Sequence, residues 1–213
     1  MNRAQLPEPE QQVDIVRSRL YHLLSVAFSF PTERTVAAGR ELRDLAETLY
    51  PEPEWDALDG SAAREELEAE YINVFDGVDQ SRYCKPYEGL WNESDRARRQ
   101  WEVKKFYSFF GLTLDRRLNE MPDHILYQLE FMHYLSYHMV RAAGTTAHPG
   151  GTVNGVENFR QAQQDFLERH LCQWLPAFCE RLQASSALPF YRQLAQLTSR
   201  FVADDLEWIR SQG

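Results

Sequence analysis

Residues 120–139 read EMPDHILYQLEFMHYLSYHM, and this stretch is the strongest indication of the fold class. Proline is tolerated at the first position of a helix, because the N–H group that it lacks would be unpaired there. We therefore expect a helix that begins at Pro122, carries Asp123 in its first turn, near the positive end of the helix dipole, and ends near Gly144. Its apolar side chains recur at spacings of three and four, the period of one helix face: Ile125, Leu129, Met132, Leu135 and Met139.

The same helical spacing extends toward the N-terminus. A first apolar stripe covers residues 13–27 and stops before a proline. Thr32 can cap a second helix, which Pro51 closes, because a threonine hydroxyl accepts a hydrogen bond from a free backbone N–H of the first turn. Ser61 can cap a third helix that runs to Phe75 by the same mechanism.

The second half of the chain is also helical in pattern. Residues 76–92 are irregular, with glycine and proline and no alternation typical of a strand, and a fourth helix is expected from about residue 94 to residue 110. Further on, a helical stripe covers residues 159–171, Pro176 restarts a shorter helix, and Pro189 begins the last one.

These elements predict an all-α protein, a single compact helical domain over residues 1–213 with roughly eight to ten helices. Residues 144–155 are rich in glycine and threonine, which is typical of a flexible connector. Residues 156–213 should dock on the first part, because so short a segment would be marginally stable alone. The connector is also a candidate hinge for domain swapping, so we expect a monomer or a domain-swapped homodimer.

The composition argues against nucleic-acid-binding and membrane-spanning proteins. The chain has 213 residues, is 43% hydrophobic and carries a net charge of -9, which argues against a broad nucleic-acid surface. No stretch approaches the ~20 apolar residues that a membrane helix needs, and the N-terminus lacks an export pattern. Three cysteines give no paired framework and suggest a reducing compartment. We therefore predict a cytoplasmic protein that binds no nucleic acid and does not insert stably into a membrane.

The motifs that accompany common enzymes are missing. The sequence has no glycine-rich phosphate loop, no Gly-x-Ser-x-Gly elbow and no Cys-x-x-Cys pair. One enzyme alternative remains, a di-iron or other metal enzyme, because Glu130 and His133 have the Glu-x-x-His spacing of helical carboxylate sites. No second copy of that spacing occurs, so we predict no enzyme, no cofactor and no metal. A generic helical adaptor protein is the other alternative.

Aromatic residues gather around the irregular segment. Tyr71 and Phe75 are four residues apart and so share one helix face, where they would be ordinary core. The loop over residues 83–91 then adds Tyr83, Tyr87 and Trp91 beside proline and glycine. Tyrosine and tryptophan supply a large contact area with one polar end, so this loop suits peptide recognition.

Four stretches, in this order, resemble the TorD/DmsD/NarJ family of redox-enzyme maturation chaperones. They are Tyr71-Ile72-Asn73-Val74-Phe75, Pro86-Tyr87-Glu88-Gly89-Leu90-Trp91, Glu120-Met121-Pro122-Asp123-His124, and residues 166–178, which read FLERHLCQWLPAF. The resemblance covers about residues 13–210. The chain departs from the family pattern at Val74, where leucine is common, and at Glu88-Gly89, where small polar residues are frequent.

The resemblance implies a cytoplasmic assembly chaperone that catalyses no reaction. Such a protein binds the catalytic subunit of a molybdopterin-containing oxidoreductase, often through its N-terminal twin-arginine signal peptide. It holds that subunit until the cofactor is inserted and so delays export. A groove that is both acidic and aromatic would complement such a peptide, which has arginines followed by an apolar helix.

The predicted client-binding site lies between the third helix, the 83–91 loop and the start of the 122–144 helix. Aromatic side chains would contact the apolar part of the peptide, carboxylates would pair with its arginines, and His124 would tune that charge or orient Asp123. Tyr71, Phe75 and Pro122 are expected to shape helix ends and core, and residues 166–178, His170 included, to pack the C-terminal part. The candidate residues are Tyr71, Phe75, Pro86, Tyr87, Glu88, Trp91, Glu120, Pro122, Asp123 and His124.

Overall fold

A computed structural model describes residues 9–59, 62–78, 81–91, 95–114, 121–144 and 156–212. The elements follow one another as α1 (Pro9–Ala27), α2 (Glu33–Leu49), a 3-10 turn (Asp56–Asp59), α3 (Arg64–Tyr71), a π-helical turn (Ile72–Asp76), a second 3-10 turn (Glu88–Leu90), α4 (Arg96–Phe109), α5 (Ile125–Gly144), α6 (Val156–Phe166), a second π-helical turn (Leu167–Leu171), α7 (Cys172–Ser185) and α8 (Pro189–Ser211).

The all-α prediction is confirmed. The described residues contain no strand, and a single isolated β-bridge joins Tyr87 to His124. Helices α6 and α7 are joined without a break by a π-helical turn and so form one continuous helix. Counted in this way, the described segments contain seven helices, slightly fewer than the eight to ten expected. None of the helices within these segments is long and apolar enough to cross a membrane.

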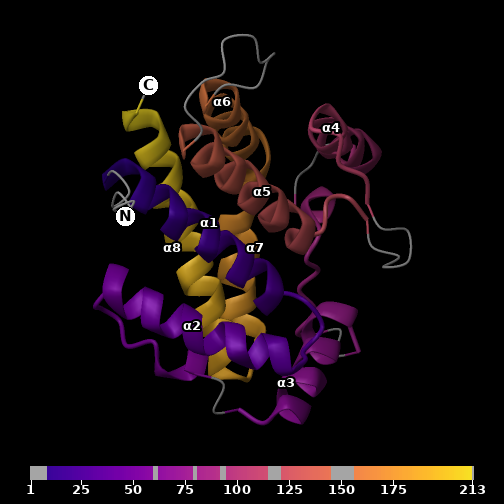
Figure 1. The fold of residues 1–213 in the computed structure, drawn as a ribbon. Coiled ribbons are helices and arrows are strands. Elements are labelled where there is room, and N and C mark those ends of the chain that lie inside the picture. The colour runs from indigo at the N-terminus through magenta and orange to yellow at the C-terminus, as the bar shows by residue number, and fades with distance from the viewer. Residues whose placement is uncertain are drawn as a thin grey trace.

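The helices pack around one core. Helix α1 lies along α5 and also contacts α2 and α8, while α7 and α8 form an antiparallel pair behind them (Figure 1). Helix α2 covers the opposite end of the molecule from α6, and α4 stands at one edge (Figure 1). The largest fully buried side chains come from both halves of the chain, which ties the C-terminal helices to the N-terminal ones: Trp55, Trp174, Tyr21, Tyr191, Phe28 and Phe131.

A buried ion pair joins the two ends of the fold. Arg17 of α1 binds the carboxylate of Asp205 on α8, where the distance from its Nη2 to Oδ2 is 3.0 Å. The same guanidinium donates to Asp14 and Gln163, and the Tyr21 hydroxyl donates to Asp205 over 2.6 Å. Paired and hydrogen-bonded in this way, the two charges meet the condition under which burial is tolerated.

Helix α5 begins three residues later than the sequence predicts. Pro122 and Asp123 form a turn before it instead of its first turn, and the helix starts at Ile125. The cause is a tertiary contact, because the Glu88 N–H donates to the Asp123 carbonyl over 3.0 Å and the Ile125 N–H donates to the Pro86 carbonyl over 2.9 Å. The Ile125 N–H, a donor that a helix start would leave free, is therefore paired with the 86–88 segment, and the Asp123 carbonyl is paired with that segment instead of with the next turn of a helix.

Two other helix boundaries differ from expectation. The N-terminal cap of α3 is at Ala63, not Ser61, and the Glu66 side chain accepts from the Ala63 N–H over 3.2 Å. Pro176 lies inside α7 and does not restart it. A proline inside a helix gives up one backbone hydrogen bond, and the buried neighbours of Pro176, Trp174, Leu175 and Phe178, keep the helix continuous despite this loss.

The flexible connector predicted at residues 144–155 falls outside the described residues after Gly144. On either side of it, α6 packs against α5, and α8 packs against α1 and α7. The hinge and the domain-swapped dimer therefore stay predictions.

Candidate functional site

Two of the motif stretches meet as a pair of short extended segments. Tyr87 and His124 form an antiparallel bridge, and the two backbone hydrogen bonds that delay the start of α5 lie on either side of it. The rings of these two residues are perpendicular, with their centroids 4.9 Å apart. The 86–91 loop is thus fixed on the segment that leads into α5, which we call the loop–helix junction.

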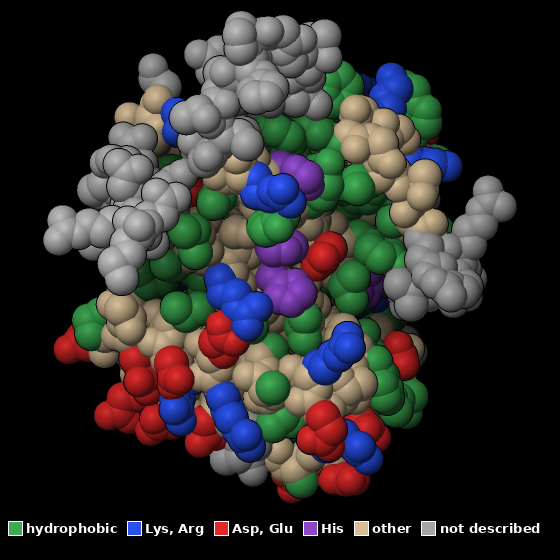
Figure 2. Space-filling model, viewed as in Figure 1, with side chains coloured by type: hydrophobic (Ala, Val, Ile, Leu, Met, Phe, Trp, Pro, Cys, Tyr) green, Lys and Arg blue, Asp and Glu red, His purple; other side chains and the backbone are tan. Residues whose placement is uncertain are grey.

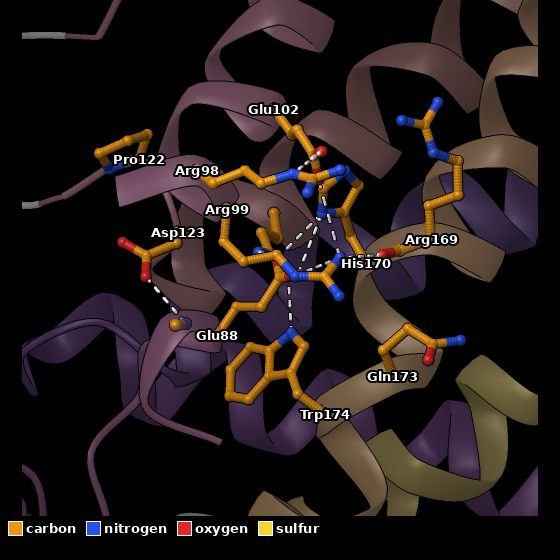
Figure 3. A network of polar contacts seen from close by, with 12 residues as sticks. Glu88, Arg98, Arg99, Glu102, Pro122, Asp123, Arg169, His170, Gln173 and Trp174 are labelled. Atoms are coloured by element: carbon orange, nitrogen blue, oxygen red, sulfur yellow. Dashed lines mark hydrogen bonds and ion pairs between the residues drawn. The ribbon is translucent and has the colours of Figure 1, made fainter. Parts of the chain in front are cut away.

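Asp123 anchors this junction from within. Its side chain is fully buried, with Oδ2 accepting from the Gly89 N–H and Oδ1 accepting from Gln100 Nε2, both over 3.0 Å (Figure 3). A Cβ at position 89 would lie 3.1 Å from Asp123 Oδ2 and 2.6 Å from Arg96 Cγ, so the close approach of the loop needs a glycine.

His124 caps α5. Its carbonyl accepts from the Gln128 N–H, and its ring Nδ1 accepts from the Leu126 N–H over 3.1 Å. Burial lowers the pKa of His124 from 6.5 to about 4, and the Asp123 charge opposes this only in part. The imidazole is therefore neutral at pH 7, as its role as an acceptor requires.

Glu88 is the centre of a second buried network. Both of its carboxylate oxygens lie 3.1 Å from His170 Nδ1, and Oε2 accepts from Gln128 Nε2 over 2.7 Å. Gln128 Oε1 in turn accepts from Trp174 Nε1 over 3.0 Å, and Arg99 Nη1 lies 3.7 Å from Glu88 (Figure 3). The loop is thereby linked to α4, α5 and α7 through polar contacts.

The aromatic candidates divide between core and surface. Tyr71 and Phe75 are buried, and the Phe75 ring stacks on Phe178 of α7 with centroids 6.3 Å apart. Trp91 is half-buried, presents an edge to the same Phe178 and donates from Nε1 to the Lys85 carbonyl over 2.7 Å. These contacts agree with the expectation that Tyr71 and Phe75 shape the core.

The other candidates are placed as follows. Pro86 is buried in the junction, Pro122 is half-buried, and the Tyr107 hydroxyl donates to the Pro122 carbonyl over 3.0 Å. Tyr87 is half-buried, with its ring on His124. Glu120 lies outside the described residues.

The structure therefore brings the Pro86–Trp91 loop and the Asp123–His124 pair together, but it directs their carboxylates inward. Glu88 and Asp123 both have fully buried side chains with internal partners. Around the Glu88 network, Figure 3 shows Arg98 and Arg169, both exposed, together with Glu102, which accepts from Arg98 Nε over 3.1 Å. Among the described residues, this junction does not present the acidic groove that the sequence analysis expected.

Exposed apolar side chains flank the junction. Leu90 is 44% exposed and Met121 is 48% exposed, one on each of the two segments that pair there. A pocket of about 260 Å³ includes Tyr107, whose hydroxyl donates to the Pro122 carbonyl. Aromatic and leucine side chains line most of it, together with Thr113 and Glu130: Tyr107, Leu112, Leu114, Tyr127, Phe131 and Tyr134. These groups provide an apolar surface next to the motif residues.

Sequence reasoning missed the glutamines of both networks. Gln128 lies between apolar positions of α5, three residues after Ile125 and four before Met132, and is fully buried. A polar residue on the apolar face of a predicted helix is the signal that identifies it, because such a group must find a buried partner. Gln100 gave no comparable signal, since its half-buried position depends on how α4 meets the junction.

Comparison with known proteins places the chain. Residues 34–180 match the model of the nitrate reductase delta subunit family. A perchlorate reductase assembly chaperone protein from Dechloromonas aromatica is 31% identical over 207 residues, which cover 91% of this chain and 89% of that protein. This chain belongs to the nitrate reductase delta subunit family.

Two further comparisons support this assignment. This chain is 28% identical to a chaperone protein TorD from Vibrio cholerae, over 78% of this chain and 70% of that protein. Its fold resembles that of an Archaeoglobus fulgidus protein named for redox enzyme maturation, with a TM-score of 0.56, 20% identity, and coverage of 95% of this chain and 99% of the other.

These comparisons confirm the resemblance to the TorD/NarJ chaperones that the motifs indicated. The relatives are named as chaperones and not as catalysts, in agreement with the prediction that this protein is not an enzyme. The matched range includes the 86–91 loop, Asp123, His124 and Trp174.

Proposed function

We propose that this protein is a cytoplasmic assembly chaperone for the catalytic subunit of a molybdopterin-containing oxidoreductase. It binds the N-terminal twin-arginine signal peptide of that subunit, holds the subunit until its cofactor is inserted, and so delays export. The proposal rests on the fixed position of the 86–91 loop at the start of α5, in a chain whose relatives include perchlorate, chlorate and selenate reductase assembly chaperone proteins.

The geometry of the loop supports peptide binding. Because Asp123 and Glu88 hold the loop through buried contacts, its surface is ordered before a client arrives, and less conformational entropy is lost on binding. Tyr87 and Trp91 are half-buried, and Leu90 and Met121 are exposed beside them. In this proposal these side chains contact the apolar part of the signal peptide.

Electrostatics supports a basic partner at longer range. The chain has a net charge of -9, which attracts a peptide that carries paired arginines and raises its rate of encounter. Glu120 is the acidic motif residue that we propose to face an arginine directly. Asp123, Glu88 and His124 are proposed to act by positioning the loop, since their side chains are buried.

The role is tested by purifying a tagged copy from its native host under anaerobic conditions and identifying the captured proteins by mass spectrometry. We expect a molybdopterin oxidoreductase subunit, and we expect its capture to be lost when its N-terminal signal is removed. Repeated purification without any such subunit would contradict the proposal.

The surface is tested with the double variant Leu90→Ser, Met121→Ser. We expect affinity for the signal peptide to fall at least about tenfold, because two exposed apolar contacts beside the junction are lost, while the melting temperature stays unchanged. Leu49→Ser is the matched control, since Leu49 is 42% exposed and is the last residue of α2, a helix that contributes no residue to the junction. Equal affinity in the double variant and the control would exclude this surface.

A further inference from the structure

A histidine and carboxylate group lies away from the loop–helix junction, between α1 and α5. His22 of α1 and Glu130 and His133 of α5 offer one ligand atom each, and all three atoms lie within 4.8 Å of one another. Figure 2 shows histidine side chains gathered beside an acidic one near the middle of the face formed by α1 and α5. We infer that these three residues bind one divalent transition-metal ion, of the zinc class, that bridges the two helices.

The donor set fits such an ion. Two imidazole nitrogens and one carboxylate oxygen are ligands that zinc accepts, with the fourth tetrahedral position left to water. In a tetrahedral site with bonds of about 2.0–2.1 Å, neighbouring ligand atoms are about 3.3 Å apart. His22 Nδ1 is already 3.7 Å from Glu130 Oε2, so small side-chain rotations complete the geometry.

Each histidine has a nitrogen available for the metal. The Nδ1 atom of His133 lies 2.9 Å from the Ser18 carbonyl oxygen and 3.0 Å from the Ser18 hydroxyl oxygen. The carbonyl oxygen can only accept, so Nδ1 carries the proton, the hydroxyl oxygen accepts beside it, and Nε2 keeps its lone pair. Metal-binding histidines commonly donate their second N–H to a carbonyl in this way. The Nδ1 atom of His22 is buried and has no hydrogen-bond partner among the described residues.

The surroundings orient the carboxylate and leave an entry path. The Ser25 hydroxyl donates to Glu130 Oε2 over 2.9 Å, as the outer contacts of metal sites do. The Glu130 side chain is 51% exposed, so an ion can reach its carboxylate from solvent.

This inference goes beyond client binding and revises the expectation of no metal. A Glu-x-x-His spacing alone gave two candidate ligands, and the third, from α1, became visible only when the helices were packed. The described residues contain a single such group, so the site is of the mononuclear kind and not the di-iron kind.

The test uses the full chain with its tag removed, stripped with a chelator, and titrated with Co²⁺ and then with Zn²⁺ in competition. We expect one equivalent of Co²⁺ to give the visible absorption of a tetrahedral site and Zn²⁺ to displace it. His133→Ala and Glu130→Gln should each weaken Zn²⁺ binding at least about tenfold, because a ligand is lost. His138→Ala is the control, a histidine of α5 whose ring packs on Tyr134 and Phe159.

A second readout separates binding from folding. Zn²⁺ should raise the melting temperature of the wild type and of His138→Ala, each compared with its own metal-free sample, because an ion that binds only the folded state stabilises it. Glu130→Gln changes a residue whose side chain is half exposed, so it should fold even if His133→Ala does not. Absence of saturable binding to the wild type, or equal Zn²⁺ affinity in Glu130→Gln, would overturn the site.

Discussion

At the scale of the residue, burial determines what the motif side chains do. Asp123 and Glu88 have the charge to pair with arginine, yet both carboxylates accept hydrogen bonds from this chain's own groups. An unpaired buried carboxylate would be costly, so each is accompanied by donors from other elements. Their contribution to client binding is therefore expected to be indirect, through the position of the loop.

The low pKa of His124 leads to a pH prediction. Because its pKa falls from 6.5 to about 4 on folding, the unfolded chain binds the proton more readily, and stability decreases as the pH is lowered from about 6.5 toward 4. The full loss from this group amounts to about 3 kcal/mol. His124→Asn keeps a capping side chain that does not titrate, so urea unfolding at pH 7, 6 and 5 should show a smaller decrease for the variant. Parallel curves for the two proteins would show that His124 titrates normally.

At the scale of the element, local capping and distant pairing contribute differently. Helix α2 begins where its own sequence directs, with the Thr32 hydroxyl accepting from the Arg34 N–H over 3.2 Å and the Thr32 N–H donating to Thr35 Oγ1 over 3.0 Å. Helix α5 begins where the 86–88 segment allows. The start of α2 can therefore be predicted from four consecutive residues, whereas the start of α5 depends on a segment more than thirty residues away and cannot be predicted locally.

The cap of α2 is open to a direct test. Thr32→Ala removes the side-chain acceptor and should lower the free energy of unfolding by about 1 kcal/mol. Thr48→Ala, at an exposed position near the other end of the same helix, should change it by less than about 0.5 kcal/mol. Chemical denaturation of both variants measures the difference, and similar losses in the two would argue against the cap.

The same distinction explains how much was predictable. Apolar spacing gave α1, α2 and α8, and Pro189 marked the first residue of α8, because these signals act within a few residues. The inward direction of Asp123 depends on Gly89 and Gln100, and the metal group depends on His22, residues that are remote in sequence. Such contacts arise from packing, which no local pattern encodes.

At the scale of the whole molecule, the first and last helices, α1 and α8, are held together by a buried ion pair. Arg17 and Asp205 tie α1 to α8, and both side chains are almost fully buried. The C-terminal helices therefore complete the core that the N-terminal helices begin, and neither part has its full set of partners alone.

Removing one partner of this pair should destabilise the whole fold. Asp205→Ala leaves the Arg17 guanidinium and the Tyr21 hydroxyl without their shared acceptor, which should cost about 3–5 kcal/mol. Glu207→Ala, at an exposed position on the same helix, should have an effect within about 0.5 kcal/mol. Urea denaturation at pH 7 compares them, and a small loss for Asp205→Ala would show that the pair adds little.

The contact between Glu88 and His170 has a consequence for the newly made chain. The two residues are 82 positions apart, so at about 5–20 residues per second a ribosome needs roughly 4 to 16 s to supply the second after the first. During that interval the 86–91 loop lacks its partner on the C-terminal side. A chaperone still in synthesis is therefore not ready for a client, and translation itself sets the moment at which it becomes ready.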